Sequence, residues 1–152
     1  VALSTEGRAQ VGGVLKEPDT FGSKMVVDPI KDRALFYGVS QNSKNSEVTV
    51  YEFNNKFRLV EEDEGKVTQE LPGLAMFSDM AATENYALFV QPPLSVAMQF
   101  LLVKEPGKVV TVEKSSATLH LVPRAGSKKA PKSITIPFDG LVELPLIHTL
   151  PC

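Results

Sequence analysis

The sequence predicts an all-β protein. Helix signals are scarce, because no long segment carries apolar residues at three- and four-residue spacing. Short runs rich in β-branched and aromatic residues recur instead, and turn residues interrupt them at intervals of roughly ten positions. A sandwich, a barrel and a piece of a propeller all fit this pattern, and periodicity does not choose among them.

The first half of the chain is expected to hold six short strands, each bounded by turn residues. The clearest is the run at 47–53, where apolar and polar residues alternate as they do in a half-buried strand. Asn54-Asn55-Lys56 then closes that strand as a hairpin-type turn. The six expected strands are residues 1–5, 24–27, 34–39, 47–53, 57–60 and 66–71.

The second half continues the pattern without a domain linker or an internal repeat. Pro92-Pro93 ends a strand, because proline cannot donate to a ladder. The turn at 105–108 predicts a hairpin between the runs that flank it, and a basic loop at 126–132 separates the last two strands. The expected strands are residues 76–81, 86–90, 95–103, 109–112, 117–122 and 133–138. We therefore expect one domain over residues 1–152.

Composition excludes several classes of protein. The chain carries 16 basic and 18 acidic residues, for a net charge of -2, which is not typical of a nucleic-acid binder. Its one cysteine, Cys152, cannot form an internal disulfide. No apolar run approaches the roughly 18 residues that span a bilayer, and the first ten residues do not read as a targeting segment. The acidic run at 61–64 is expected to be a solvated loop.

Four stretches together resemble the carotenoid cleavage oxygenase family, which includes retinal pigment epithelium isomerases. MFSDMAATENYALFVQPPL, at 76–94, is similar to the family motif in which His-Asp precedes Phe-Ala-x-Thr-Glu-Asn-Tyr and a strand. SKMVVDPIKDRALFYGVS, at 23–40, is similar to the segment Ala-His-Pro-Lys-x-Asp-Pro and the strand after it. VTVYEFNNKFRLVEE resembles the connecting hairpin, and ATLHLVPRAG, at 117–126, resembles a later strand that ends in Pro-Arg. Order and spacing agree over residues 1–126.

The resemblance implies a seven-bladed β-propeller with an iron(II) ion on its axis, held by four histidines from different blades. Members cleave or isomerise carotenoid-derived polyenes, and the cleaving members use dioxygen. A four-stranded blade takes roughly 40–50 residues, so this chain supplies about three blades and cannot close the ring. The predicted fold is therefore a partial β-propeller.

Two of the implied metal-ligand positions lack histidine. Ser78 stands before Asp79 where the family motif has its histidine, and Lys24 stands at the histidine position of the earlier segment. A serine hydroxyl is a poor ligand for ferrous iron, and a lysine must first lose its proton. We therefore expect no metal and no catalytic residue in this chain, with iron(II) as the cofactor only if the chain is part of an enzyme.

The two histidines do not restore the ligand set. His120 lies in an alternating strand outside any ligand motif and is interpreted as a surface or packed residue. His148 falls near the third family histidine but is followed by Leu150-Pro151-Cys152, so it is either a vestigial ligand or an ordinary residue. A triad of His120, His148 and Asp79 is conceivable, but no spacing supports it.

The residues around Ser78 can be interpreted as parts of a structural bend as well as parts of a metal site. Thr83 and Asn85, on either side of Glu84, can hydrogen-bond nearby backbone groups in a tight bend. Asp79 is expected to bind backbone N–H groups at the end of its strand. If Lys24 lies near the propeller axis, its ammonium needs a carboxylate or solvent, because an unpaired buried charge is costly.

These observations leave three hypotheses. The first is a non-catalytic carotenoid-oxygenase-like domain, acting as a structural or pigment-associated component of a larger assembly. The second is a partial chain of an iron-dependent dioxygenase that cleaves a polyene double bond, and the third is an unrelated all-β binding module. Open strand edges predict protein partners that cover them. The resemblance implies a plastid, thylakoid-associated location, and the alternative is a soluble intracellular one.

Overall fold

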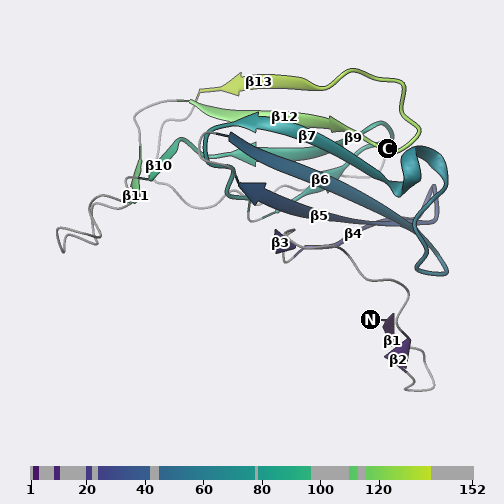
Figure 1. The fold of residues 1–152 in the computed structure, drawn as a ribbon. Helices are drawn as coiled ribbons and strands as arrows, with labels where there is room; N and C mark the ends of the chain where they lie inside the picture. The colour runs from purple at the N-terminus through teal and green to yellow at the C-terminus, as the bar shows by residue number, and fades with distance from the viewer. Residues whose placement is uncertain are drawn as a thin grey trace.

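The computed structural model describes residues 2–3, 9–10, 20–21, 24–41, 45–77, 79–96, 110–112 and 116–137. Nearly all regular structure in these ranges is β-strand, and the exception is a short 3-10 turn, η1, at Glu62–Gly65. The predicted all-β class is confirmed (Figure 1). No helix in these ranges is long and apolar enough to cross a membrane.

The first large sheet is an antiparallel meander. Its central strands β5 and β6 pair along nine residue positions, from Arg33–Asn54 to Gln41–Ser46. At one edge, β3 and β4 pair with different parts of β5, and β7 forms the other edge beside β6. The strands are β3 (Thr20–Phe21), β4 (Val26–Asp28), β5 (Arg33–Gln41), β6 (Asn45–Asn54) and β7 (Lys66–Pro72).

The second large sheet repeats this arrangement, with the order β13-β12-β9-β8. Its strands are β8 (Ala81–Ala82), β9 (Tyr86–Gln91), β12 (Ala117–Pro123) and β13 (Lys132–Ile136). Two short hairpins lie outside the large sheets: β1 (Ala2–Leu3) with β2 (Ala9–Gln10), and β10 (Leu94–Val96) with β11 (Val110–Val112). β10 and β11 pair antiparallel, as expected for the runs at 95–103 and 109–112, while the predicted turn at 105–108 lies outside the described residues.

The core lies between the two large sheets. Tyr37 of β5 and Phe89 of β9 are both buried, and their rings meet edge to face with centroids 5.3 Å apart. Phe77 packs against both of these rings. The buried cluster draws on both sheets and comprises Leu35, Tyr37, Val48, Val50, Leu71, Ala75, Met80, Ala87, Phe89 and Val122.

The strand expected at 57–60 is wrong. Asn54 accepts hydrogen bonds through its side-chain oxygen from the backbone N–H groups of Lys56 and Arg58, which curls the chain into a turn. Phe57 has a φ of 55°, in the left-handed region that a strand does not use. Leu59 makes one isolated bridge to Phe53, so the turn side chains override the β-rich composition of this segment.

The strand expected at 76–81 is also wrong, except that Ala81 begins β8. Side chains bind the backbone at Phe77 and at Ala75, just before the segment. Ser46 Oγ accepts the N–H of Ala75 at 2.8 Å, and Tyr37 donates its hydroxyl to the carbonyl of Phe77 at 3.0 Å. Sequence reasoning also missed β2 and β3, and its expectation for 97–103 lies outside the described residues.

The strand order explains where the two sheets meet. In each sheet the strands follow chain order, which is the pattern of a propeller blade and not of a Greek-key sandwich. The first-sheet edge strand β4 and the second-sheet edge strand β8 contact each other. The segments that lead into β4 and β8 are therefore brought together.

Candidate functional site

Lys24 and Asp79 meet where these two edge strands begin. Lys24 lies two residues before β4, and Asp79 lies two residues before β8. The Lys24 ammonium Nζ is 3.5 Å from Asp79 Oδ2, although 55 positions separate the two residues in the chain. Asp79 is 4% exposed and Lys24 is 49% exposed, so the carboxylate is fixed inside the fold and the amine opens to solvent.

Asp79 has the backbone contact that the sequence predicts. Its Oδ1 accepts the N–H of Met80 at 2.8 Å, while Oδ2 faces Lys24. Burial, and then the negative charge of Asp79, raise the pKa of the Tyr37 hydroxyl above its ordinary value. The Asp79 carboxylate therefore has a defined orientation at the margin of the aromatic core.

The Lys24–Asp79 pair does not provide an iron site. A lysine ammonium offers three donors and no lone pair, so it cannot ligate while it pairs with a carboxylate. No group of three or more histidine, cysteine, aspartate or glutamate residues lies close enough to hold a metal within the part of the chain that the structure describes. Lys24 and Asp79 as they are paired here do not fit iron(II). Ser78 and His148 lie outside the described residues.

His120 is a packed histidine whose hydrogen bonds fix its tautomer. The Gln91 amide nitrogen donates to the carbonyls of Pro72 and Leu74, so Gln91 Oε1 is left to accept from His120 Nε2 at 2.7 Å. His120 Nδ1 then accepts from Ser133 Oγ at 2.9 Å. Burial lowers the pKa of His120 below its ordinary value. Both ring nitrogens are occupied, and the imidazole is a structural element of the second sheet.

The bend at 83–85 is held mainly through its backbone. Thr83 Oγ1 bonds both the N–H and the carbonyl of Tyr86 at 3.2 Å, and the Thr83 N–H donates to the same carbonyl at 2.8 Å. The Glu84 carbonyl accepts from Lys31 Nζ, and the Asn85 carbonyl accepts from the N–H of Arg124. These contacts support a structural role for Thr83, Glu84 and Asn85 in a tight bend.

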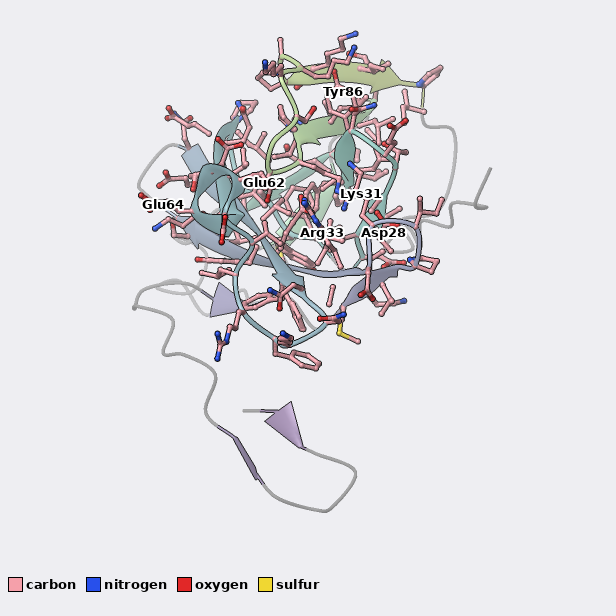
Figure 2. All side chains as sticks on the ribbon, turned by 90° about the vertical axis from the view of Figure 1, so that its right-hand side faces the viewer. Asp28, Lys31, Arg33, Glu62, Glu64 and Tyr86 are labelled. Carbon is pink, nitrogen blue, oxygen red and sulfur yellow. The ribbon has the colours of Figure 1, made fainter. Side chains whose placement is uncertain are left out.

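A buried network of charges lies beside this bend, and sequence reasoning missed it. Arg124 is 1% exposed and donates to Glu52, to Asp28 at 2.6 Å and to the carbonyl of Thr83 at 2.8 Å. Arg33 adds contacts to Glu52 at 3.3 Å and to Glu62 at 3.0 Å. Figure 2 looks onto this end of the molecule, where Asp28, Arg33 and Glu62 lie on neighbouring loops and strand ends.

One signal in the sequence could have revealed the network. Val48, Val50 and Glu52 share one face of β6 because side chains alternate along a strand, and both valines are buried. Glu52 is therefore a carboxylate on the core side of its sheet, which requires a cation partner. Desolvation opposes the charge on Asp28, but hydrogen bonds from Arg124 and from the backbone N–H groups of Lys31 and Ile30 lower its pKa.

Comparison with known proteins decides the family. The family model described as retinal pigment epithelial membrane protein matches residues 1–148. The chain belongs to this family. The carotenoid-oxygenase resemblance is thereby confirmed, and the hypothesis of an unrelated all-β module is wrong. No curated protein sequence matches the chain.

Solved structures of the family show the same fold. A cobalt-substituted apocarotenoid oxygenase from Synechocystis matches with a TM-score of 0.70 and 22% sequence identity. A chimera of that oxygenase with RPE65 matches with the same two values. In both cases the match covers 89% of this chain and 30% of the other, so this chain spans about 30% of their length. The fold is a partial propeller, and the described residues hold two of its blades.

Proposed function

We propose that this chain is a non-catalytic carotenoid-oxygenase-like domain that acts as a structural or pigment-associated component of a larger assembly. The observation that carries the proposal is the Lys24–Asp79 ion pair at the start of β4 and β8. The resemblance assigns the Lys24 position to a metal-binding histidine, and a cation at that position opposes the binding of a second cation. The same resemblance assigns a second histidine to the position of Ser78.

The outward face of the second sheet supports a role within an assembly. Leu88 and Leu121 pair across β9 and β12, as do Val90 and Leu119, and all four side chains are partly exposed. Ile134 of β13 pairs with Leu119 and is 49% exposed. Apolar side chains that share one sheet face are stabilised when another layer covers them. Either another chain or further blades of a longer protein would supply that layer.

Metal analysis of the purified chain tests the proposal. We expect substoichiometric iron after the chain is exposed to ferrous iron under anaerobic conditions and freed of loosely bound metal. The matched control is the Lys24→Met variant, which removes the positive charge while keeping a long apolar stem. Stoichiometric iron in the unmodified chain would overturn the proposal.

A second candidate is a partial chain of an iron-dependent dioxygenase. The observation that favours it is the 30% coverage of the solved apocarotenoid oxygenases, since further blades could bring further ligands. Sequencing the full transcript separates the two candidates. A reading frame that adds blades with histidines, together with iron in the longer product, would favour the enzyme. The plastid location belongs to the proposal too, and fractionation of intact organelles would check it.

A further inference from the structure

Ser133 donates its hydroxyl hydrogen to a buried imidazole, which is an arrangement that activates a serine as a nucleophile. Ser133 Oγ lies 2.9 Å from His120 Nδ1, and His120 Nε2 donates to Gln91 Oε1 at 2.7 Å. We propose that Ser133 accepts an acyl group from an activated ester, with His120 as its general base and Gln91 as the residue that positions the ring. This inference goes beyond the proposed function, because it uses neither residue of the Lys24–Asp79 pair.

The strand register brings these three side chains together. His120 of β12 and Ser133 of β13 are direct cross-strand partners, so their side chains lie on the same face of the sheet. On the other side of β12, His120 pairs with Phe89 of β9, and Gln91 lies two residues further along β9 on that same face. The long Gln91 side chain therefore reaches the ring diagonally.

The tautomer of His120 is the one that a base for Ser133 needs. The Gln91 amide nitrogen is held by the carbonyls of Pro72 and Leu74, to which it donates at 3.0 Å each. The Gln91 oxygen therefore accepts from His120 Nε2, which leaves the lone pair of Nδ1 for the Ser133 hydroxyl. A nucleophile beside a base that a third group orients is the arrangement of a catalytic triad, here with an uncharged orienting group.

Burial keeps the base neutral while the nucleophile stays open to reagents. His120 is 1% exposed, whereas Ser133 is exposed. Burial also lowers the pKa of His120, so the ring is neutral near pH 7, and only a neutral imidazole has a lone pair that can accept the serine proton. Because the hydroxyl hydrogen points toward the ring, the lone pairs of Ser133 Oγ are left for an electrophile.

The edge position of β13 suits attack on a carbonyl group. β13 is the outermost strand of its sheet, and among the described strands it pairs with β12 alone (Figure 1). Alternate residues of an antiparallel edge strand direct their backbone N–H groups away from the partner strand. Backbone N–H groups are the donors that stabilise the negative oxygen that develops during acyl transfer.

The covalent step balances without an oxidant, a reductant or a metal. Ser133 Oγ attacks the carbonyl carbon of the ester while its proton passes to His120 Nδ1, and a tetrahedral intermediate forms. The intermediate then collapses, and the leaving oxygen departs with the electron pair of the broken carbon–oxygen bond and takes the proton from His120. One serine and one ester therefore give one acyl-serine and one alcohol.

Acetylation by p-nitrophenyl acetate tests the inference. Peptide mass spectrometry locates the acetyl groups, and hydroxylamine removes serine esters while lysine amides persist. We expect a hydroxylamine-sensitive acetyl group on Ser133 that is lost in Ser133→Ala and forms about 100-fold more slowly in His120→Gln. The matched control is Thr135→Ala, exposed on the same strand, which should label as the unmodified chain does. Acetyl groups on lysines alone, or an unchanged rate at Ser133 in His120→Gln, would overturn the inference.

A thiol in place of the hydroxyl tests the base even if His120→Gln does not fold. The thiol of Ser133→Cys lies beside His120 and should lose its proton to the ring, whereas Thr135→Cys places a thiol opposite Thr118 on the same strand pair. We expect iodoacetamide to alkylate Ser133→Cys about tenfold faster than Thr135→Cys near pH 7. Peptide mass spectrometry separates both sites from Cys152. Equal rates would overturn the assignment of His120 as the base.

Nitrogen NMR of the imidazole tests the positioning role of Gln91. We expect His120 to carry its proton on Nε2 in the unmodified chain, and Gln91→Met to show a mixture of both tautomers together with slower acetylation of Ser133. An unchanged tautomer in Gln91→Met would overturn the positioning role. Iron content is measured on the same samples: an unreactive Ser133 in an iron-free chain overturns this inference alone, and stoichiometric iron with a reactive Ser133 overturns the proposed function alone.

Discussion

Arg124 and Glu52 form a two-point ion pair in which neither side chain reaches solvent. Arg124 Nε donates to Glu52 Oε1 at 3.2 Å, and Nη2 donates to Oε2 at 2.9 Å, with each side chain 1% exposed. Glu52 belongs to β6 of the first sheet, and Arg124 directly follows β12 of the second. The N–H of Ala125 adds a hydrogen bond to Oε1 at 2.9 Å. This pair therefore joins the two sheets through charge as well as apolar packing.

Arg124→Met should strongly destabilise the fold. Among the described residues, the variant leaves the buried Glu52 carboxylate with Arg33 alone as a cationic partner, and breaking one side of a buried pair costs about 3–5 kcal/mol. Denaturant unfolding of the purified variant would measure the change. The exposed Lys128→Met is the control, with an expected change within about 0.5 kcal/mol. Equal stabilities of the two variants would show that Arg33 is sufficient to neutralise Glu52.

His120 should make stability depend on pH in the mildly acidic range. Burial lowers its pKa in the folded state, so the unfolded chain binds the proton first as pH falls. The contribution of neutral His120 to the free energy of unfolding is complete above the pKa of about 6.5 that histidine has in the unfolded chain. It is lost as the pH falls from there through the lower pKa of His120 in the folded state. Unfolding free energies between about pH 7 and about pH 5 should fall for the unmodified chain and fall less for His120→Gln. If the unfolding free energies of the unmodified chain and of His120→Gln fell in parallel over this pH range, the prediction would be wrong.

Gly65→Ala should be far more damaging than Gly73→Ala. Both glycines have positive φ, +71° and +69°, so alanine at either position carries a strain of about 1–2 kcal/mol. At Gly65 an added Cβ would also lie 2.7 Å from Leu59 Cβ and 2.9 Å from the backbone nitrogen of Val60. At Gly73 the nearest atom is 4.0 Å away. Thermal midpoints of the two variants provide the comparison, and similar midpoints would mean that the Glu62–Gly65 turn relaxes freely.

Thr83→Ala should destabilise the fold more than Glu84→Ala, although both residues belong to one motif. The Thr83 hydroxyl bonds Tyr86, and its loss should cost about 1 kcal/mol. Glu84 accepts a hydrogen bond from Lys31 through its backbone carbonyl, which alanine retains, so the change should stay within about 0.5 kcal/mol. Chemical denaturation of both variants would establish the order. A larger loss for Glu84→Ala would indicate a side-chain role.

The sequence by itself determined the all-β class, most strand positions and the family. The alternation at 47–53 is local, because successive side chains of a strand point to opposite faces whatever lies around them. It therefore predicted β6, and the same alternation could have shown that Glu52 shares the buried face of Val48 and Val50. The motifs around Lys24 and Ser78 were readable for a similar reason, since residue order alone carries them.

Only the tertiary structure decided which distant groups meet. Lys24 and Asp79, 55 positions apart, become partners because β4 and β8 lie side by side, and Arg124 reaches Glu52 because two sheets stack. It also decided that residues near 77 form no strand, and the Tyr37 hydroxyl and Ser46 Oγ bind the backbone at Phe77 and at Ala75. The physical reason is that strand periodicity depends on adjacent residues, whereas ion pairs and side-chain-to-backbone bonds depend on how complete sheets pack.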